Sequence, residues 1–123
     1  MPKILVVDDE ADLRGMIVVA LRSRGYETIE AENGIDAYNL AKTQLPQLII
    51  SDVTMASGSG FMLWEFLKKD DRTDHIPVIL MTGDAQRAGA WGSESELEYI
   101  EKPFSIDTLL AFVQRKLGFP LGS

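Results

Sequence analysis

The chain has 123 residues, 46% of them hydrophobic and 25% charged, so it can form one apolar core and is too short for two ordinary domains. Its formal net charge of −7 disfavours binding to nucleic acid or to an anionic membrane, because both need a basic surface. It contains no cysteine, which excludes disulfides and thiolate chemistry. The apolar run at 4–7 is too short for a signal peptide or a membrane span, so we expect a cytoplasmic protein.

The first half of the chain alternates between short apolar runs and segments with helical spacing. Residues 4–7 predict a buried strand, and Gly25 predicts the end of the helix that follows. Residues 26–30 alternate weakly, as in an edge strand. The turn signal at 33–34 precedes a second helix. The predicted inner faces are Leu13, Met16, Ile17, Ala20 and Leu21 in the first helix, and Ile35, Ala37, Leu40 and Ala41 in the second.

The second half continues this alternation. A strongly apolar strand at 48–50 stops at Asp52, and a loop rich in glycine and serine then leads into a third helix. Further strands are predicted at 77–81 and 97–100, and Ser105 has the character of an N-cap for the last helix. The predicted inner faces are Leu63, Trp64 and Leu67 in the third helix, and Leu110, Val113 and Leu117 in the last.

Five strand–helix alternations predict an open parallel sheet with helices on both faces, joined by right-handed crossovers. We therefore expect a flavodoxin-like (βα)5 three-layer sandwich with strand order 2-1-3-4-5. It would occupy residues 1–119, with 120–123 as a tail, a linker start or a remnant.

Polar residues follow four of the predicted strands. Asp8 and Asp9 follow the first strand, Asp52 the third, Thr82 the fourth and Lys102 the fifth. In this strand order the first and third strands are neighbours at the switch point, where such sheets bind ligands, so these side chains converge. Clustered carboxylates repel one another unless a cation is present, and oxygen ligands suit Mg²⁺. A carboxylate nucleophile beside a metal, a hydroxyl and an ammonium indicates a phosphoryl-transfer site.

At these residues the chain resembles the response-regulator receiver family, through the segments ILVVDDE, LIISDVTM, VILMTG and YIEKPF. The resemblance implies that Asp52 accepts a phosphoryl group from a sensor histidine kinase, a histidine phosphotransfer protein or a small donor. It implies that Mg²⁺ is bound by Asp9, Asp52 and the main-chain carbonyl of Thr54, with Asp8 acting directly or through water. It makes the chain a phosphorylation-switched binding module for an unknown effector rather than an enzyme.

The resemblance also assigns the switch. Lys102 would pair with the phosphoryl group, Thr82 would hydrogen-bond to it, and Tyr99 would turn toward the space that Thr82 vacates. The Lys102–Pro103 bond is expected to be cis. The chain departs from the family at Ala56, where proline is usual, and between Thr82 and Lys102, where glycine and serine make a poor helix interior. That region carries part of the family's output surface, so coupling of the switch could be weak.

A helical wheel of the first helix suggests a docking surface. It places Val18 and Val19 on the outer side, with Arg14 and Arg22 at the rim, and this strip could dock a helix of a kinase or phosphotransfer protein. The alternative is scattered surface apolar residues, which are common.

Two other functions stay open at this point. One is a phosphatase with an aspartyl nucleophile, although such enzymes carry a second aspartate where this chain has Thr54. The other is an inert receiver-like scaffold. We expect the only histidine, His75, to be exposed and not catalytic, and Glu10 to be a helix-start acid rather than a metal ligand.

Overall fold

The computed structural model describes residues 2–53, 59–83 and 97–117. The predictions for Thr54, Ala56 and the region 84–96 concern residues outside these ranges. The elements of the described chain are, in order, β1 (Lys3–Val7), α1 (Ala11–Ser23), β2 (Glu27–Ala31), α2 (Gly34–Gln44), β3 (Leu48–Asp52), α3 (Gly60–Lys68), β4 (Val78–Thr82), β5 (Leu97–Glu101) and α5 (Ile106–Leu117).

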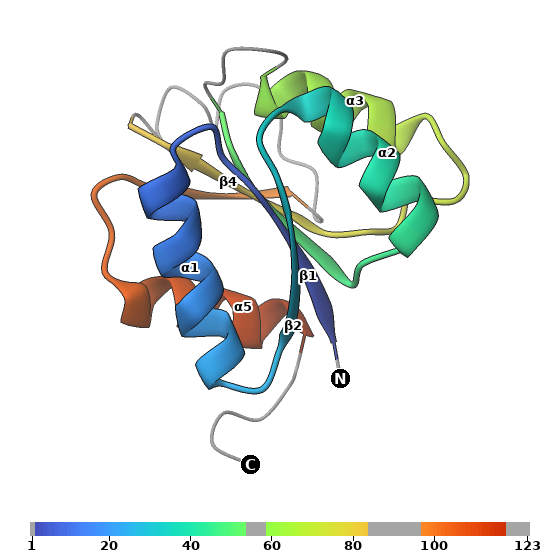
Figure 1. Cartoon of the computed structure of the whole chain (residues 1–123). Coiled ribbons are helices and arrows are strands. Elements are labelled where there is room, and N and C mark those ends of the chain that lie inside the picture. The colour runs from blue at the N-terminus through green and yellow to red at the C-terminus, as the bar shows by residue number, and fades with distance from the viewer. Residues whose placement is uncertain (1, 54–58, 84–96, 118–123) are drawn as a thin grey trace.

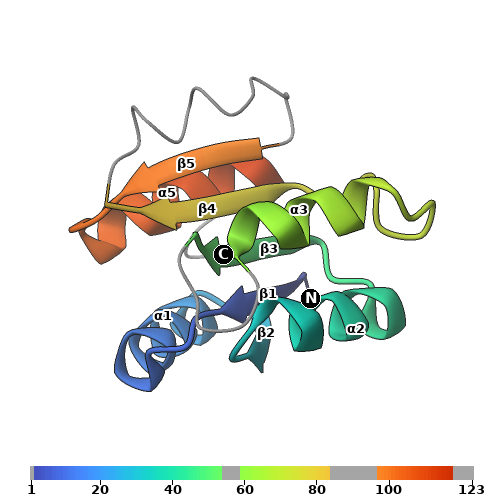
Figure 2. The same ribbon diagram turned by 90° about the horizontal axis from the view of Figure 1, so that it is seen from above.

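The strands form one parallel sheet in the order β2-β1-β3-β4-β5, which confirms the prediction. Helices α1 and α5 cover one face of the sheet, and α2 and α3 cover the other (Figures 1 and 2). The fold is therefore a three-layer α/β sandwich of the flavodoxin-like type. Among the described residues, no helix is long and apolar enough to cross a bilayer.

The core consists of two apolar clusters, one on each face of the sheet. β3 and β4 are buried along their whole length, because they lie in the middle of the sheet with helices on both sides. Since a strand's side chains alternate between faces, Ile50 packs under α1 and α5 while Ile49 packs under α2 and α3.

Side-chain caps fix where three helices begin. The Asn33 side chain accepts a hydrogen bond from the Asp36 N–H at 2.8 Å, so the predicted turn at 33–34 is an N-cap of α2. Ser59 caps α3 through the Met62 N–H at 3.1 Å. Ser105 accepts from the Thr108 N–H at 3.1 Å, as predicted for the last helix.

The predicted orientation of α1 is wrong in part. Val18 is only 6% exposed and packs in the core beside Ile17, whereas Met16 is 52% exposed. Val19 is 70% exposed, as predicted. The run Met16-Ile17-Val18-Val19 is apolar all round, so the wheel has no unique inner side, and packing against the sheet and α5 selects one. In α2, Ile35 is likewise exposed, at 56%.

Candidate functional site

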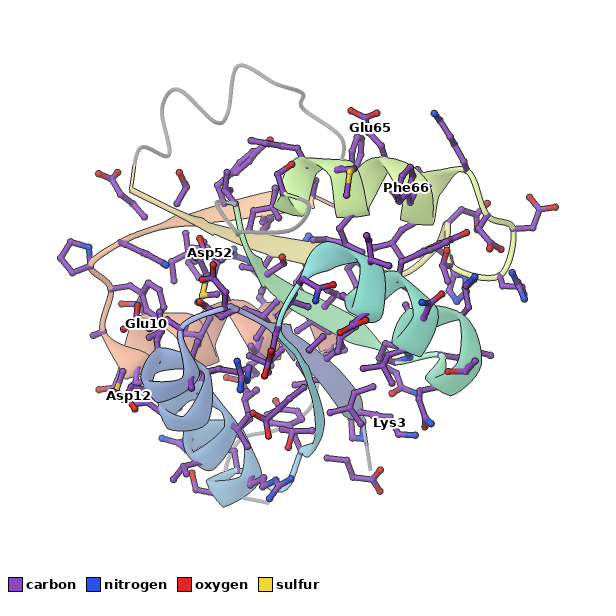
Figure 3. The ribbon with its side chains drawn as sticks, turned by 45° about the horizontal axis from the view of Figure 1, so that its top comes forward. Lys3, Glu10, Asp12, Asp52, Glu65 and Phe66 are labelled. Atoms are coloured by element: carbon purple, nitrogen blue, oxygen red, sulfur yellow. The ribbon has the colours of Figure 1, made fainter. Side chains whose placement is uncertain are left out.

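The site lies at the carboxyl ends of the inner strands. Asp8 directly follows β1, Asp52 is the last residue of β3, Thr82 the last of β4, and Lys102 directly follows β5. Figure 3 shows Asp52 at this end of the sheet, close to the loop that carries Glu10. The structure thus brings together the residues predicted from four separate segments.

Three carboxylates share a small volume at this edge. Asp8, Asp9 and Asp52 each offer an oxygen, and these atoms all lie within 4.8 Å of one another. Asp8 is 0% exposed and Asp52 is 9% exposed, while Asp9 is open to solvent. Oδ1 of Asp8 accepts a hydrogen bond from the Glu10 N–H at 2.8 Å. Its other oxygen, Oδ2, is buried and has no hydrogen-bond partner among the described residues.

The surroundings of the buried Asp8 carboxyl disfavour its ionised form. Burial raises its pKa, and the negative charges of Asp52 and Asp9 raise it further. The Glu10 N–H and the ammonium of Lys102 act in the opposite direction, but the pKa stays above its usual range. An unsatisfied, buried oxygen within an acidic cluster makes this edge of the sheet a candidate cation site. Three carboxylates fit a hard divalent ion such as Mg²⁺.

Lys102 supplies the positive charge of the cluster. Its Nζ lies 3.2 Å from Oδ2 of Asp52 and 3.9 Å from Oδ2 of Asp8. Its main-chain N–H donates to the Thr82 carbonyl at 2.7 Å, and the bond to Pro103 is cis, as predicted. A single ammonium does not balance three ionised carboxylates, so the Lys102 charge is compatible with a cation site at this cluster.

Gly60 is a site residue that the sequence reasoning missed. A Cβ at this position would collide with the main-chain carbonyl of Asp52, so the start of α3 approaches β3 as closely as only glycine permits. The Gly60 N–H donates to the Val53 carbonyl at 3.0 Å, which ties α3 to the residue after Asp52. The available signal was a glycine directly after the Ser59 cap.

Comparison with known proteins identifies the family. Residues 4–114 match the response regulator receiver domain. The chain belongs to this family. It is 35% identical to the polar-differentiation response regulator DivK of Brucella anthropi, across 96% of this chain and 98% of that protein. It is 42% identical to the phosphate regulon transcriptional regulatory protein PhoB of Pseudomonas aeruginosa, across 88% of this chain but only 48% of PhoB.

A solved structure shares the fold of this receiver. It is the magnesium-bound receiver domain of a sensor histidine kinase from Pseudomonas aeruginosa PAO1, with a TM-score of 0.85 and 24% identity over 96% of this chain and 98% of that one. Family membership makes the chain a phosphoacceptor module of two-component signalling.

Tyr99, the predicted switch aromatic of the receiver, lies on β5 opposite Leu80 of β4. Its ring packs on the α2–α3 side of the sheet, with its centroid 6.3 Å from that of Phe61. Its hydroxyl is buried without a hydrogen-bond partner among the described residues, and burial raises its pKa. Thr82 is 8% exposed at the end of the neighbouring strand. Their involvement in a switch stays a prediction.

The four predicted docking residues do not form one surface strip. Val18 is buried, and both arginines are tied to β2 or to the acidic loop. The outer apolar residues of α1 are instead Met16 and Val19. A mostly apolar groove of about 390 Å³ lies beside the acidic site, lined by Leu13, Met16, Lys102, Pro103 and Phe104. His75, as predicted, is exposed, with 73% of its side chain accessible.

Proposed function

We propose that Asp52 is the phosphoacceptor of this receiver. An oxygen of its carboxylate attacks the phosphorus of a phosphohistidine, the P–N bond breaks, and the histidine leaves with the bonding electron pair. The product is an aspartyl phosphate, and its hydrolysis restores the carboxylate. The observation that carries this proposal is the position of Asp52, which lies 3.2 Å from the Lys102 ammonium and within reach of two more carboxylates.

Mg²⁺ is the proposed cofactor, held by the carboxylates of Asp8, Asp9 and Asp52. The main-chain carbonyl of Thr54 completes the set that the resemblance implies, although it lies outside the described residues. Oδ2 of Asp8, which has no hydrogen-bond partner within the described ranges, supports this assignment. When bound, the ion neutralises charge on the phosphoryl oxygens, which is the main requirement of phosphoryl transfer.

Lys102 and Thr82 are proposed to hold the transferred group. Lys102 already has its ammonium beside Asp52, so it can pair with a phosphoryl oxygen without a large movement. The Thr82 hydroxyl would donate a second hydrogen bond. Tyr99, on the adjacent strand, is proposed to respond to Thr82 and so alter the surface presented to a downstream effector.

The proposed phosphodonor is a sensor histidine kinase or a histidine phosphotransfer protein. The groove between α1 and the residues after β5 shares Lys102 with the site, so a donor seated there would place its histidine near Asp52. We propose this groove as the docking surface in place of the strip through Val18. Its action is proposed to take place in the cytoplasm, and the net charge of −7 disfavours direct binding of nucleic acid.

Labelling with acetyl phosphate and Mg²⁺, followed by intact mass measurement, tests the proposed function. Wild type should gain one phosphoryl group and lose it again over time, whereas Asp52→Asn should gain none. Asp74→Asn, which changes an exposed aspartate away from the cluster, is the matched control and should label normally. Label retained in Asp52→Asn would refute the assignment. Catalytic turnover of a phosphate ester without labelling of wild type would favour the phosphatase. A wild-type protein that neither takes up label nor turns over an ester would favour the inert scaffold.

A further inference from the structure

Arg14 joins three parts of the receiver at the edge of the acidic site. Its Nη1 donates to the main-chain carbonyl of Asp8 at 2.6 Å, and its Nε donates to Oε1 of Glu30 at 2.9 Å. The side chain of Arg14 is only 13% exposed, although it belongs to the first turn of α1. A guanidinium is planar and rigid, so these two bonds fix the position of the Asp8 carbonyl relative to β2.

This contact completes a set of bonds around Asp8. The Asp8 N–H donates to the Ala31 carbonyl at 3.1 Å, and Oδ1 accepts from the Glu10 N–H at 2.8 Å. Arg14 secures the main-chain carbonyl, whereas Oδ2, which lies 3.9 Å from the Lys102 ammonium, has no hydrogen-bond partner in the described part of the chain. The backbone of Asp8 is therefore held at both ends by the last residues of β2.

The Asp8 carbonyl belongs to the peptide unit that joins Asp8 to Asp9. Because a peptide unit is planar, the direction of this carbonyl also sets the direction in which the Asp9 main chain leaves. The hydrogen bond from Arg14 therefore acts on the peptide unit that links the two aspartates.

We propose that Arg14 is a positioning residue for the cation site, which holds the Asp8–Asp9 peptide so that both carboxylates face Asp52. This inference rests on the proposed Mg²⁺ site. Positioning by Arg14 can be distinguished from a direct effect of its charge on the ion, because a guanidinium near the cluster would repel a divalent cation. Removal of that charge alone would strengthen Mg²⁺ binding, whereas loss of positioning weakens it.

Arg22 offers a matched control. It also lies on α1 and ties that helix to β2, with its Nε donating to Oγ1 of Thr28 at 2.7 Å. It does not share the hydrogen bond to the Asp8 carbonyl. Arg14→Met and Arg22→Met therefore remove the same charge and a similar helix–strand contact, but only the first releases the acidic loop.

The test is Mg²⁺ binding to the full chain by titration calorimetry, at a temperature where every variant is folded. Arg14→Met should weaken binding about ten-fold, as is typical for partners that orient metal ligands, and Arg22→Met should leave it unchanged. Arg14→Lys keeps the charge but not the planar fork, so it should also weaken binding. Arg14→Lys is the more conservative change, so it tests the inference even if Arg14→Met fails to fold. The increase in Tm with added MgCl2 provides a second readout of the same affinity.

Three results would overturn the inference: tighter or unchanged binding in Arg14→Met, unchanged binding in Arg14→Lys, or equal weakening in the Arg14→Met and Arg22→Met variants. A wild-type protein that binds no Mg²⁺ would overturn the proposed metal site, and this inference with it. The two failures are distinguished by the wild-type titration alone.

Discussion

Replacement of Asp8 by asparagine should stabilise the metal-free receiver. Asp8 is 0% exposed, one of its oxygens has no hydrogen-bond partner among the described residues, and that oxygen lies 3.9 Å from the Lys102 ammonium. Asn retains an oxygen to accept from the Glu10 N–H and removes the buried charge. A buried charged group left unsatisfied costs about 1–3 kcal/mol or more, so the free energy of unfolding should rise by that order. For a domain of this size the corresponding rise in Tm is roughly 4–12 °C.

The assay is thermal unfolding in EDTA and again in excess MgCl2, with Asp74→Asn as the control. Asp74 is an exposed aspartate, so the same chemical change there should leave Tm nearly unaltered. In MgCl2 the Tm advantage of Asp8→Asn over wild type should shrink or change sign, because wild type gains stability from the ion and the variant lacks one of its ligands. An equal or lower Tm for Asp8→Asn in EDTA would refute the electrostatic reasoning.

The pH dependence supplies a further check of the same residue. The folded-state pKa of Asp8 lies above the ordinary value of 3.8, so its ionised form destabilises the fold at neutral pH. As the pH falls from 7 through the raised pKa, Asp8 takes up a proton in the folded state and this destabilisation is lost. The advantage of Asp8→Asn in EDTA should therefore shrink on acidification. An advantage that grew would contradict the sign of the shift.

Three more predictions follow from packing and charge. Gly60→Ala should lower the free energy of unfolding by about 1–3 kcal/mol and slow the labelling of Asp52, because the new Cβ would meet the Asp52 carbonyl. Gly15→Ala has open space around its new Cβ in α1, so its free energy of unfolding should rise by up to about 1 kcal/mol in denaturant titrations. Val18→Asp should unfold the receiver, whereas Val19→Asp should leave far-UV circular dichroism unchanged. The hydrogen bond from the Arg72 guanidinium holds the pKa of the Asp70 carboxyl well below its usual range. The stability that the ionised Asp70 contributes should therefore be lost only in strong acid, as the pH falls through its folded-state pKa, and thermal scans at decreasing pH measure this loss.

Much of the site was predictable because each of its parts is local in the sequence. An apolar run that ends in a polar residue shows where a buried strand stops, and parallel strands end at the same edge of a sheet. The sequence alone therefore predicts that Asp8, Asp52, Thr82 and Lys102 lie at one edge of the sheet. The N-cap at Ser105 was predictable for the same reason, since a cap is a contact between residues three apart.

Features that depend on long-range packing were not predictable in this way. The run at 16–19 of α1 is apolar on every side, so only contact with the sheet and α5 decides that Val18 is buried and Met16 exposed. Gly60 has a role only because α3 starts against the Asp52 carbonyl. Similarly, the sequence around Arg14 indicates only a surface arginine, and its role depends on the fold placing Glu30 of β2 beside it.

The chemistry of this receiver can be read from the sequence: which strands end in carboxylates, which strand ends in a hydroxyl, and where the ammonium follows. These are properties of single residues and of short periodic patterns, which the chain carries whatever its neighbours are. The geometry comes from the folded chain, in which Asp8 is a buried carboxylate with one oxygen hydrogen-bonded, held by Arg14 and β2. Burial and orientation are set by elements distant in the chain, because they arise from packing and from hydrogen bonds between those elements.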